Sequence, residues 1–463
     1  MPFLPSGPRE NTPISARPSG ASGRRPHPAR SGAGPHGAEP DGTKPYGDRP
    51  YGDRAIGNRP TGGWCGGRRH RGEPGPRPRA AALRSLLLRV GPADREVLWL
   101  YLTTRMGIWA TAYCARWLFP ADRNSRDAGP VLAPFQQWDW THYLHIARDG
   151  YFPGQGEFLH RTLDHREAFL PGFPLVLRAV HTAVPSWAAA GLLISFAAGA
   201  VAVLALSRIA RLHLPDHEAG RRTVMFLLLS PCAVFLAAGY TEALFLALAL
   251  PAWLAAQRRN WPLAATLTAL ATTVRVNGLF LAAAVALHFI LTARTGRHWR
   301  RLPWLALPAV PLVLYSGYLH AHTGDWMAWK HAEEQGWNRT FHTPWEAWSN
   351  TWHNAFSHAQ TTGYAVMFQA ELLAMLAGLA LLALLARQRR WAEALYIGLT
   401  LWALGTSYWY MSIPRSTLLW WPLWITLAGW SLRRPGFKTL CLGLATPVTT
   451  AVALTFLSGR WAG

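Results

Sequence analysis

The residues with the clearest chemical potential lie in a short polar stretch that follows the first long apolar run. Asp139 stands there between Trp138 and Trp140, and His142 follows three residues later. Tryptophan is enriched at the membrane interface, where partly apolar surroundings raise the pKa of a carboxyl group. A carboxylate with a raised pKa is suited to accept a proton as a general base. The alternative is a solvated aspartate at the start of an interfacial helix.

Further charged and aromatic groups stand in the other polar segments between apolar runs. Arginine binds phosphate through two parallel hydrogen bonds, indole faces stack on sugar rings, and a carboxylate can take a proton from a hydroxyl. A cavity that combines these groups at a membrane surface fits a sugar carried on a lipid phosphate. The candidate substrate-binding residues are Trp138, His142, His165, Arg166, Glu167, Glu242, Arg275, Asn277, Asp325 and Arg415.

Two of these candidates also have a simpler interpretation. Glu242 stands near the predicted start of a helix, where a carboxylate gains about 0.3–1 kcal/mol from the helix dipole. Arg275 lies in a turn between two apolar segments of about 15 residues each, which cover only about 22 Å as helices. The turn is therefore expected below the membrane surface, where an arginine is a candidate functional residue. Alternatively, its side chain extends to the headgroups.

The apolar runs predict an all-α, multi-pass membrane protein. A membrane-spanning helix needs about 20 consecutive apolar residues, fewer where the helix is short or tilted. We predict about eleven transmembrane helices, at 97–119, 187–207, 223–239, 242–256, 261–275, 278–293, 303–320, 363–386, 391–410, 416–431 and 439–457.

The loops between these runs alternate in charge, which predicts the orientation. Positive residues concentrate in cytoplasmic loops. Every second loop is basic, namely those that contain Arg208 to Arg222, Arg258 and Arg259, Arg294 to Arg301, Arg387 to Arg390, and Arg433 to Lys438. We therefore expect a cytoplasmic N-terminus in a cell-membrane protein. The two long loops, 120–186 and 321–362, face outward with all the candidate site residues, so the site is extracytoplasmic.

The composition divides the chain into two unlike parts. The 463 residues carry a formal net charge of +22 and include 25 Trp, yet the mean hydropathy is only +0.04. Residues 1–92 are rich in Pro, Gly and Arg and are predicted to be a disordered cytoplasmic tail, because they cannot bury enough apolar surface. Residues 93–463 form the predicted membrane domain. The basic residues lie in the tail and in alternate loops, so we expect a lipid bilayer as partner and no nucleic acid.

Metal and nucleotide motifs are absent from the sequence. The four cysteines show no metal-ligand spacing, so neither a zinc site nor a disulfide is expected. The sequence contains no phosphate-binding glycine motif that would open a nucleotide domain. Nucleotide sugars are also confined to the cytoplasm, so a sugar donor on the outer face must be carried by a lipid. We expect no cofactor and no metal.

A series of motifs follows a fixed order along the chain. Its residues are Trp138, Asp139, His142, Ile146, Ala147, Gly150 and Tyr151, then 168–174, 240–245, 273–278, Gly324, Asp325 and Trp337, and finally 412–415. In these residues and their order, the chain resembles the PIG-V-like mannosyltransferases, a family of the GT-C class of membrane glycosyltransferases. The resemblance spans roughly residues 95–435 and excludes the tail, and Leu170, Thr241 and Val276 depart from the family pattern.

The resemblance implies a GT-C-like architecture and an inverting transfer of mannose. The donor would be polyprenyl-phosphate-mannose and the product an α-mannoside on an acceptor hydroxyl. Asp139 would act as the general base, while Arg275 and Arg415 would stabilise the leaving phosphate. His142, Glu167 and Glu242 would shape the sugar pocket. The acceptor could be a glycolipid, a lipoglycan or a protein, and the alternative function is a flippase or transporter of polyprenyl-linked sugars.

Overall fold

The computed structural model describes residues 91–118, 130–153, 165–293 and 299–462. Within these ranges the chain forms helices and connecting turns and no strand, which confirms the all-α prediction. The predicted tail lies outside the described residues except at positions 91 and 92. Parts of the first predicted outer loop, at 119–129 and 154–164, also lie outside them.

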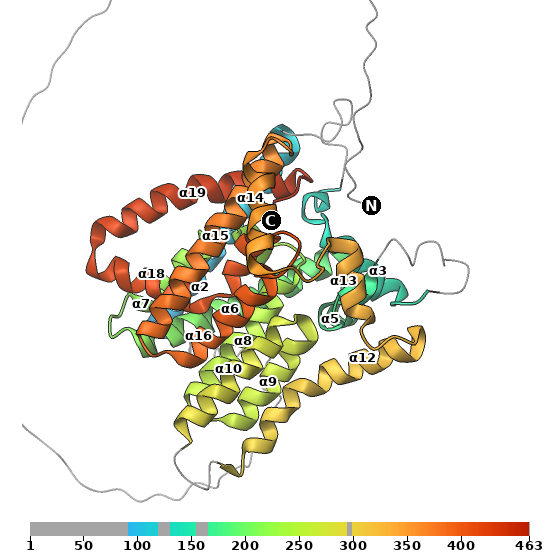
Figure 1. Cartoon of the computed structure of the whole chain (residues 1–463). Coiled ribbons are helices and arrows are strands. Elements are labelled where there is room, and N and C mark those ends of the chain that lie inside the picture. Colours follow the sequence, from blue (N-terminus) through green and yellow to red (C-terminus); the bar gives the residue numbers. More distant parts are fainter. Residues whose placement is uncertain (1–90, 119–129, 154–164, 294–298, 463) are drawn as a thin grey trace, which may run out of the picture. The chain divides into compact units, whose positions relative to one another are not determined.

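Each predicted apolar run contains a helix (Figure 1). The helices of these runs are α2 (Pro92–Leu118), α6 (Trp187–His213), α7 (Ala219–Leu228), α8 (Thr241–Gln257), α9 (Trp261–Val274), α10 (Asn277–Thr292), α12 (Val310–Thr323), α15 (Thr362–Arg387), α16 (Trp391–Gly405), α18 (Trp421–Arg433) and α19 (Pro435–Leu457). The segment η5 (Leu302–Ala309) leads directly into α12. Between the runs lie α3 (Asp139–Asp149), α5 (Gly172–His181), α13 (Ala328–Trp337), α14 (Pro344–Phe356) and α17 (Ile413–Ser416).

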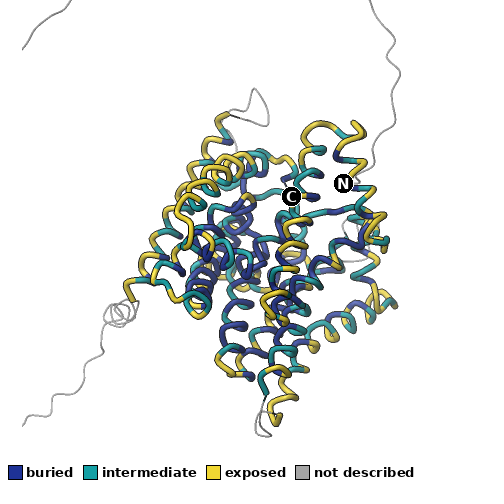
Figure 2. The backbone as a smooth tube through the Cα atoms, turned by 60° about the vertical axis from the view of Figure 1, so that its left-hand side comes forward, coloured by how far each residue is buried: buried dark blue, intermediate teal, exposed yellow. Residues whose placement is uncertain are grey.

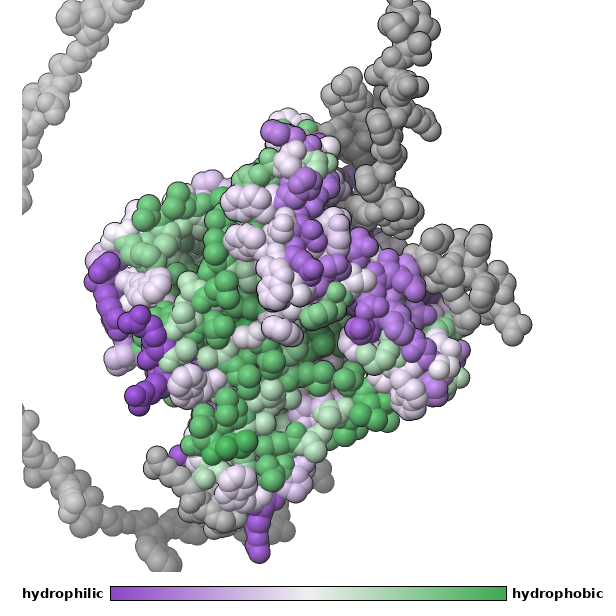
Figure 3. Space-filling view, in the orientation of Figure 1, coloured by the Kyte–Doolittle hydropathy of each residue, from purple (hydrophilic) through white to green (hydrophobic). Residues whose placement is uncertain are grey.

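Four segments of the described chain are long and apolar enough to cross a bilayer. They are α6, the continuous segment Leu302–Thr323, α15 and α19. The helices α8, α9 and α10 are apolar but shorter. These helices support a multi-pass membrane protein, whereas the count of eleven spans stays a prediction. On the face shown in Figure 3, apolar residues form a broad area, and hydrophilic residues gather over α13 and α14.

One predicted span is wrong as a single helix. The run 223–239 is divided into α7, which ends at Leu228, and the short 3-10 segment η4 (Ala233–Leu236). Pro231 lies in the break. Proline has no backbone N–H to continue the helix, and it disfavours helical geometry at the preceding residue, Ser230. The break lets the chain return to the site through Tyr240.

The core of the described chain centres on α8, which packs against α6 on one side and α9 on the other. Small residues on the buried face of α6 follow helical spacing, at Gly191, Ser195, Ala198 and Ala202. Small side chains let helices approach closely in a membrane, where packing rather than hydrophobic expulsion from water drives association. Figure 2 shows that the buried residues gather in the interior of the helical part and that the exposed ones lie on its outside.

Trp140 fixes α3, and so Asp139, against this core. Its side chain is buried. A Cβ atom placed on Gly191 of α6 would lie 2.4 Å from Trp140 Cζ3, and one on Gly239 would lie 2.5 Å from the same atom. The indole therefore occupies a gap that exists only because both positions are glycine. This gap brings the start of α3 next to the start of α8.

We predict that Gly191→Ala destabilises the protein by about 1–3 kcal/mol, because the added methyl displaces Trp140 from a filled space. The matched control is Gly317→Ala in α12, where a Cβ would meet nothing within 4 Å. The control should melt at or slightly above the wild-type temperature, since alanine favours helix over glycine. The measurement is the apparent melting temperature of both purified variants in detergent. Equal melting of the two variants would show that the gap is not needed.

Candidate active site

Four charged side chains from distant parts of the chain meet at one place. They come from the start of α3 (Asp139), the first turn of α8 (Glu242), the turn between α9 and α10 (Arg275) and the short helix α17 (Arg415). Arg415 donates from Nη1 to Asp139 Oδ2 at 2.7 Å and from Nε to Glu242 Oε1 at 2.5 Å. Arg275 donates from Nη1 to the same Glu242 oxygen at 2.7 Å. We call these four residues the charge cluster.

The charge cluster is recessed and electrically balanced, with two carboxylates and two guanidinium groups. The Glu242 side chain is fully buried, and the Arg415 side chain is 9% exposed. The side chains of Asp139 and Arg275 keep 22% and 20% exposure. A buried charge is strongly destabilising without a partner, so the burial of Glu242 requires both arginines. The two partly exposed members can therefore contact a ligand, while Glu242 and Arg415 hold them in place.

The geometry of Arg275 decides between its two interpretations. Its Nη1 also donates to Thr241 Oγ1 at 2.6 Å, and the side chain points into the protein. The alternative of a side chain extended to the headgroups is therefore wrong. Glu242 does occupy the first turn of α8, as its simpler interpretation requires. It nevertheless binds two arginines, so the helix dipole alone does not account for it.

The expectation of a raised pKa for Asp139 is wrong. Burial raises the pKa of this carboxyl group, but the ion pair with Arg415 and the nearby Arg275 outweigh burial and hold the pKa below its usual value. Burial likewise lowers the pKa of Arg415, but Glu242 and Asp139 raise it well above its usual value. Both groups are therefore charged at neutral pH. Asp139 is ready to accept a proton but is a weaker base than the sequence suggested.

Arg415 is held by contacts that the sequence analysis did not identify. Glu371 of α15 accepts hydrogen bonds from the backbone N–H groups of Ser412 at 2.6 Å and Ile413 at 2.8 Å. These bonds fix the start of α17, where Ser412 has a left-handed φ of 66°. The Arg415 guanidinium lies 4.8 Å from the ring centre of Tyr240, a cation–π contact. The signal for Glu371 was an acidic residue inside an otherwise apolar run, which is a functional candidate by default.

Aromatic rings form one wall beside the charge cluster. His142 stacks on Phe169 with ring centres 4.7 Å apart, and Trp337 of α13 meets His142 edge-on at 5.7 Å. Glu333 lies one helical turn before Trp337 and pairs with Arg339 at 2.8 Å. Burial raises the pKa of Glu333 more than Arg339 lowers it, and the charge of Asp139 raises it further. Glu333 is thus a second carboxyl group that is sensitive to the cluster, and it was not among the sequence candidates.

Four other candidates hold the backbone around the site. Trp138 donates from its indole to the carbonyl of Arg460 at 3.2 Å. Arg166 is buried and donates to the carbonyl of Gly150 at 3.0 Å. The Glu167 carbonyl accepts a hydrogen bond from Tyr315 at 2.8 Å. The rings of His165 and Trp337 meet edge-on with centres 6.3 Å apart.

The last two candidates differ in position. Asn277 is buried at the start of α10, two residues after Arg275. Asp325 is not part of the charge cluster. Its carboxylate accepts from the backbone N–H of Met327 at 2.8 Å and pairs with His331 at 2.6 Å, so it organises the start of α13. In the part of the chain that the structure describes, no group of three or more metal-ligating side chains occurs.

We predict that Arg415→Gln costs about 3–5 kcal/mol of stability, because it leaves buried carboxylates without their main partner. The double variant Arg415→Gln/Glu242→Gln removes both charges and should recover part of this loss. Arg434→Gln, at an exposed position outside the site, serves as the control. Denaturant unfolding in detergent measures all three. A double variant no more stable than the single one would contradict the coupling of Arg415 to Glu242.

Comparison with known proteins shows that part of the chain is similar to a described family. Residues 125–302 match the family model described as "Mannosyltransferase (PIG-V)". The chain is similar to proteins named "GPI alpha-1,6-mannosyltransferase 2". It is 33% identical to the Mus musculus protein over 195 residues, which are 39% of this chain and 36% of that relative. The Homo sapiens protein is 34% identical over 162 residues, 32% of this chain and 30% of the relative.

These alignments therefore cover only about a third of the relatives' length. The matched residues nevertheless include Asp139, Glu242 and Arg275, three of the four members of the charge cluster. Arg415 lies beyond them and joins the cluster through the fold. Over residues 125–302 the chain is PIG-V-like, as its sequence motifs predicted.

Proposed function

We propose that the protein is a membrane glycosyltransferase that moves mannose from polyprenyl-phosphate-mannose to an acceptor hydroxyl. The observation that carries the proposal is the charge cluster, most of which lies within the PIG-V-like residues 125–302. It offers a carboxylate for a proton and a guanidinium for a phosphate in one recessed site. The acceptor is a glycolipid, a lipoglycan or a protein that reaches the membrane surface.

The proposed reaction is a single displacement with inversion. The acceptor oxygen attacks C1 of a β-linked mannosyl phosphate, and the bond from C1 to the phosphate oxygen breaks, which gives an α-mannoside and polyprenyl phosphate. Asp139 takes the hydroxyl proton as the new bond forms. Arg415 binds Asp139 through Oδ2 alone, so Oδ1 remains available to the acceptor. General-base assistance of this kind contributes about 10²–10⁴-fold to the rate.

Arg275 is the proposed ligand of the leaving phosphate. Its Nη1 is bound to Thr241 and Glu242, and its other guanidinium nitrogens make no hydrogen bond to the described residues. That edge can donate two parallel bonds to phosphate oxygens. Negative charge builds on the phosphate as the bond breaks, so a fixed guanidinium stabilises the transition state more than the ground state. Arg415 acts beside it by fixing Asp139 and adding positive charge.

The orientation of the site is part of the proposal. The basic alternate loops support a cytoplasmic N-terminus and an extracytoplasmic site in a cell membrane, with about eleven spans in a GT-C-like arrangement. His142, Phe169 and Trp337 offer ring faces to a sugar. The proposed leaving group is a phosphomonoester, which needs less charge neutralisation than a diphosphate. The two arginines therefore take the place of a metal ion in this mechanism.

We expect Asp139→Asn to lower the transfer rate by about 10²–10⁴-fold, because the amide cannot accept the proton. The amide oxygen can still accept the bond from Arg415, but the ion pair is lost, so the melting temperature should fall, by less than in Arg415→Gln. The assay uses purified protein, radiolabelled mannosyl polyprenyl phosphate and fractionated membrane lipids. Full transfer by the variant would remove Asp139 from the mechanism. Movement of labelled lipid between leaflets without any transfer would instead support a flippase.

The pH dependence of the wild-type rate provides a further check. Because Arg415 holds the pKa of Asp139 below its usual value of 3.8, Asp139 stays ionised from about pH 5 to 7. Titration of Asp139 should therefore cause no fall in kcat/KM in this range. An acidic fall that disappears in Asp139→Asn would contradict the assignment of a lowered pKa. A fall that disappears in Glu333→Gln would assign it to Glu333.

We expect Arg275→Lys to reduce kcat by at least about tenfold, because an ammonium has three donors and no planar fork. It therefore cannot keep the bonds to Thr241 and Glu242 and also donate two parallel bonds to phosphate oxygens. Arg258→Lys is the control, since Arg258 is exposed at the far end of α8. The control should keep wild-type kinetics. Unchanged kinetics in both variants, with normal expression, would leave Arg275 without a role in phosphate binding.

A further inference from the structure

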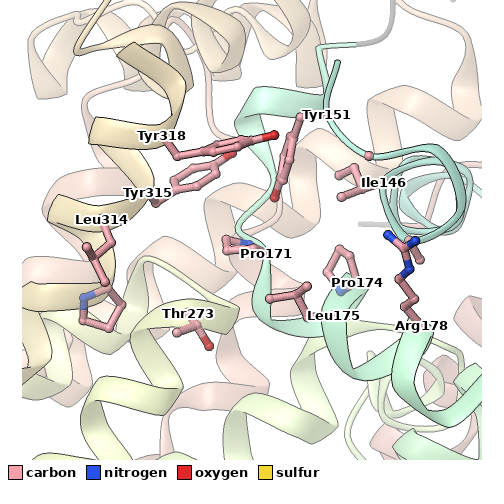
Figure 4. Close-up of a pocket in the computed structure, with 13 residues that line it drawn as sticks. Ile146, Tyr151, Pro171, Pro174, Leu175, Arg178, Thr273, Leu314, Tyr315 and Tyr318 are labelled. Carbon is pink, nitrogen blue, oxygen red and sulfur yellow. The ribbon is translucent and has the colours of Figure 1, made fainter. Parts of the chain in front are cut away.

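An apolar pocket lies between α3, α5 and α12 (Figure 4). Its volume is about 530 Å³, within the range of about 300–1,000 Å³ that ligand sites usually have. One side is formed by Ile146, Pro174 and Leu175, and the other by Leu314 and the rings of two tyrosines. The walls are therefore mostly hydrocarbon and ring faces. One charged side chain, Arg178 of α5, also lines the pocket, and no carboxylate does.

Exposed apolar side chains border the pocket. Leu175 is 62% exposed and Leu314 is 68% exposed, although both line the pocket. Leu314 belongs to the segment Leu302–Thr323, which is long and apolar enough to cross a bilayer. Only Tyr315 and Leu319 of α12 are buried, and Val313 is 64% exposed, so one face of this helix lacks protein cover. A hydrocarbon chain can enter from the bilayer without crossing water.

One segment separates the pocket from the proposed sugar site. The Phe169 carbonyl accepts hydrogen bonds from Tyr151 at 2.7 Å and Tyr315 at 3.1 Å, and both tyrosines line the pocket. The ring of the same Phe169 stacks on His142, on the side of the charge cluster. The pocket and the polar site are thus the two sides of a single wall.

One residue that lines the pocket stands close in the chain to Arg275, the residue that we propose to bind the phosphate. Thr273 lines the pocket, and Arg275 follows two residues later. A Cβ on Gly172 would lie 2.4 Å from Thr273 Oγ1 and 2.7 Å from its carbonyl oxygen, so the start of α5 presses on the end of α9. This close approach places the pocket next to Arg275 and allows little movement between them.

We propose that this pocket binds the isoprenoid chain of the lipid-phosphate donor, an inference that rests on the proposed function. The chain of such a donor is bonded to the phosphate itself, so it must leave the site where the phosphate is bound. The pocket begins at that point, beside Thr273. An acceptor glycolipid differs, because sugar residues separate its reacting hydroxyl from its hydrocarbon. The donor is therefore the occupant that the position of the pocket favours.

The test narrows the pocket and compares donors of different chain length. Leu314→Trp and Leu175→Trp place bulk on opposite walls. Val313→Trp is the matched control, because Val313 is 64% exposed on the same helix but does not line the pocket. KM is measured for a long-chain mannosyl polyprenyl phosphate and for a short analogue with a single isoprene unit.

The pocket variants should raise KM for the long donor about tenfold or more and leave KM for the short donor unchanged. The control should leave both values unchanged. Equal effects on both donors, or a rise only in the KM of the acceptor lipid, would overturn the proposal. In the second case the pocket would hold the acceptor.

A binding experiment separates this proposal from the proposed function. A photoreactive polyprenyl phosphate without mannose is crosslinked to the full-length protein, and the labelled peptides are identified by mass spectrometry. We expect labels on α5 and α12 that unlabelled polyprenyl phosphate removes and that Leu314→Trp weakens. Such labels without any mannosyl transfer would refute the transferase and retain the pocket. Transfer with labels only elsewhere would refute the pocket and retain the transferase.

Discussion

The buried carboxylate of Glu242 is the constraint on which the rest of the site depends. It is fully buried at the start of α8, and a buried charge is strongly destabilising unless an opposite charge pairs with it. Arg275 and Arg415 supply the pairing from two other segments. Arg415 carries an additional positive charge, which Asp139 balances from α3. The fold must therefore bring four chain segments to one point, and the two outer members of the cluster keep free edges for chemistry.

The contacts around the charge cluster hold its members in place and still leave two of them partly exposed. Glu371 fixes the backbone that carries Arg415, and Trp140 locks the helix that carries Asp139 between two glycines. Neither contact fills the space in front of Asp139 and Arg275, which keep partial exposure. Preorganised charges stabilise a transition state most when they need not move during the reaction. The supporting residues thus serve the proposed chemistry by restricting motion, while the aromatic wall of Phe169 and Trp337 borders the space.

The sequence predicted the positions of the helices and the charged residues better than the contacts between them. Hydropathy alone located the helices of the apolar runs, because a membrane-spanning helix is recognised by its length and apolar composition. The break at Pro231 was missed, although proline carried the signal. The pKa of Asp139 was predicted in the wrong direction, because its direction depends on Arg415, a partner 276 residues away in the chain. Glu371 carried a signal, as an acidic residue in an apolar run, but its partners are backbone N–H groups, which the sequence cannot identify. Glu333 matters only because α13 folds over the site.

Phe169 lies between the part of the site proposed for the sugar and the pocket proposed for the hydrocarbon chain. A lipid-linked sugar is polar at one end and hydrocarbon at the other. A site for it must therefore pass from a polar lining to an apolar lining over a short distance. Phe169 can do this because its ring faces the polar site while its carbonyl binds two tyrosines of the apolar pocket. The backbone polar group is thereby satisfied inside hydrocarbon, where an unpaired carbonyl would be costly. In the proposed function, the same residue would separate the hydrocarbon of the donor from the charges and so align the donor before any group reacts.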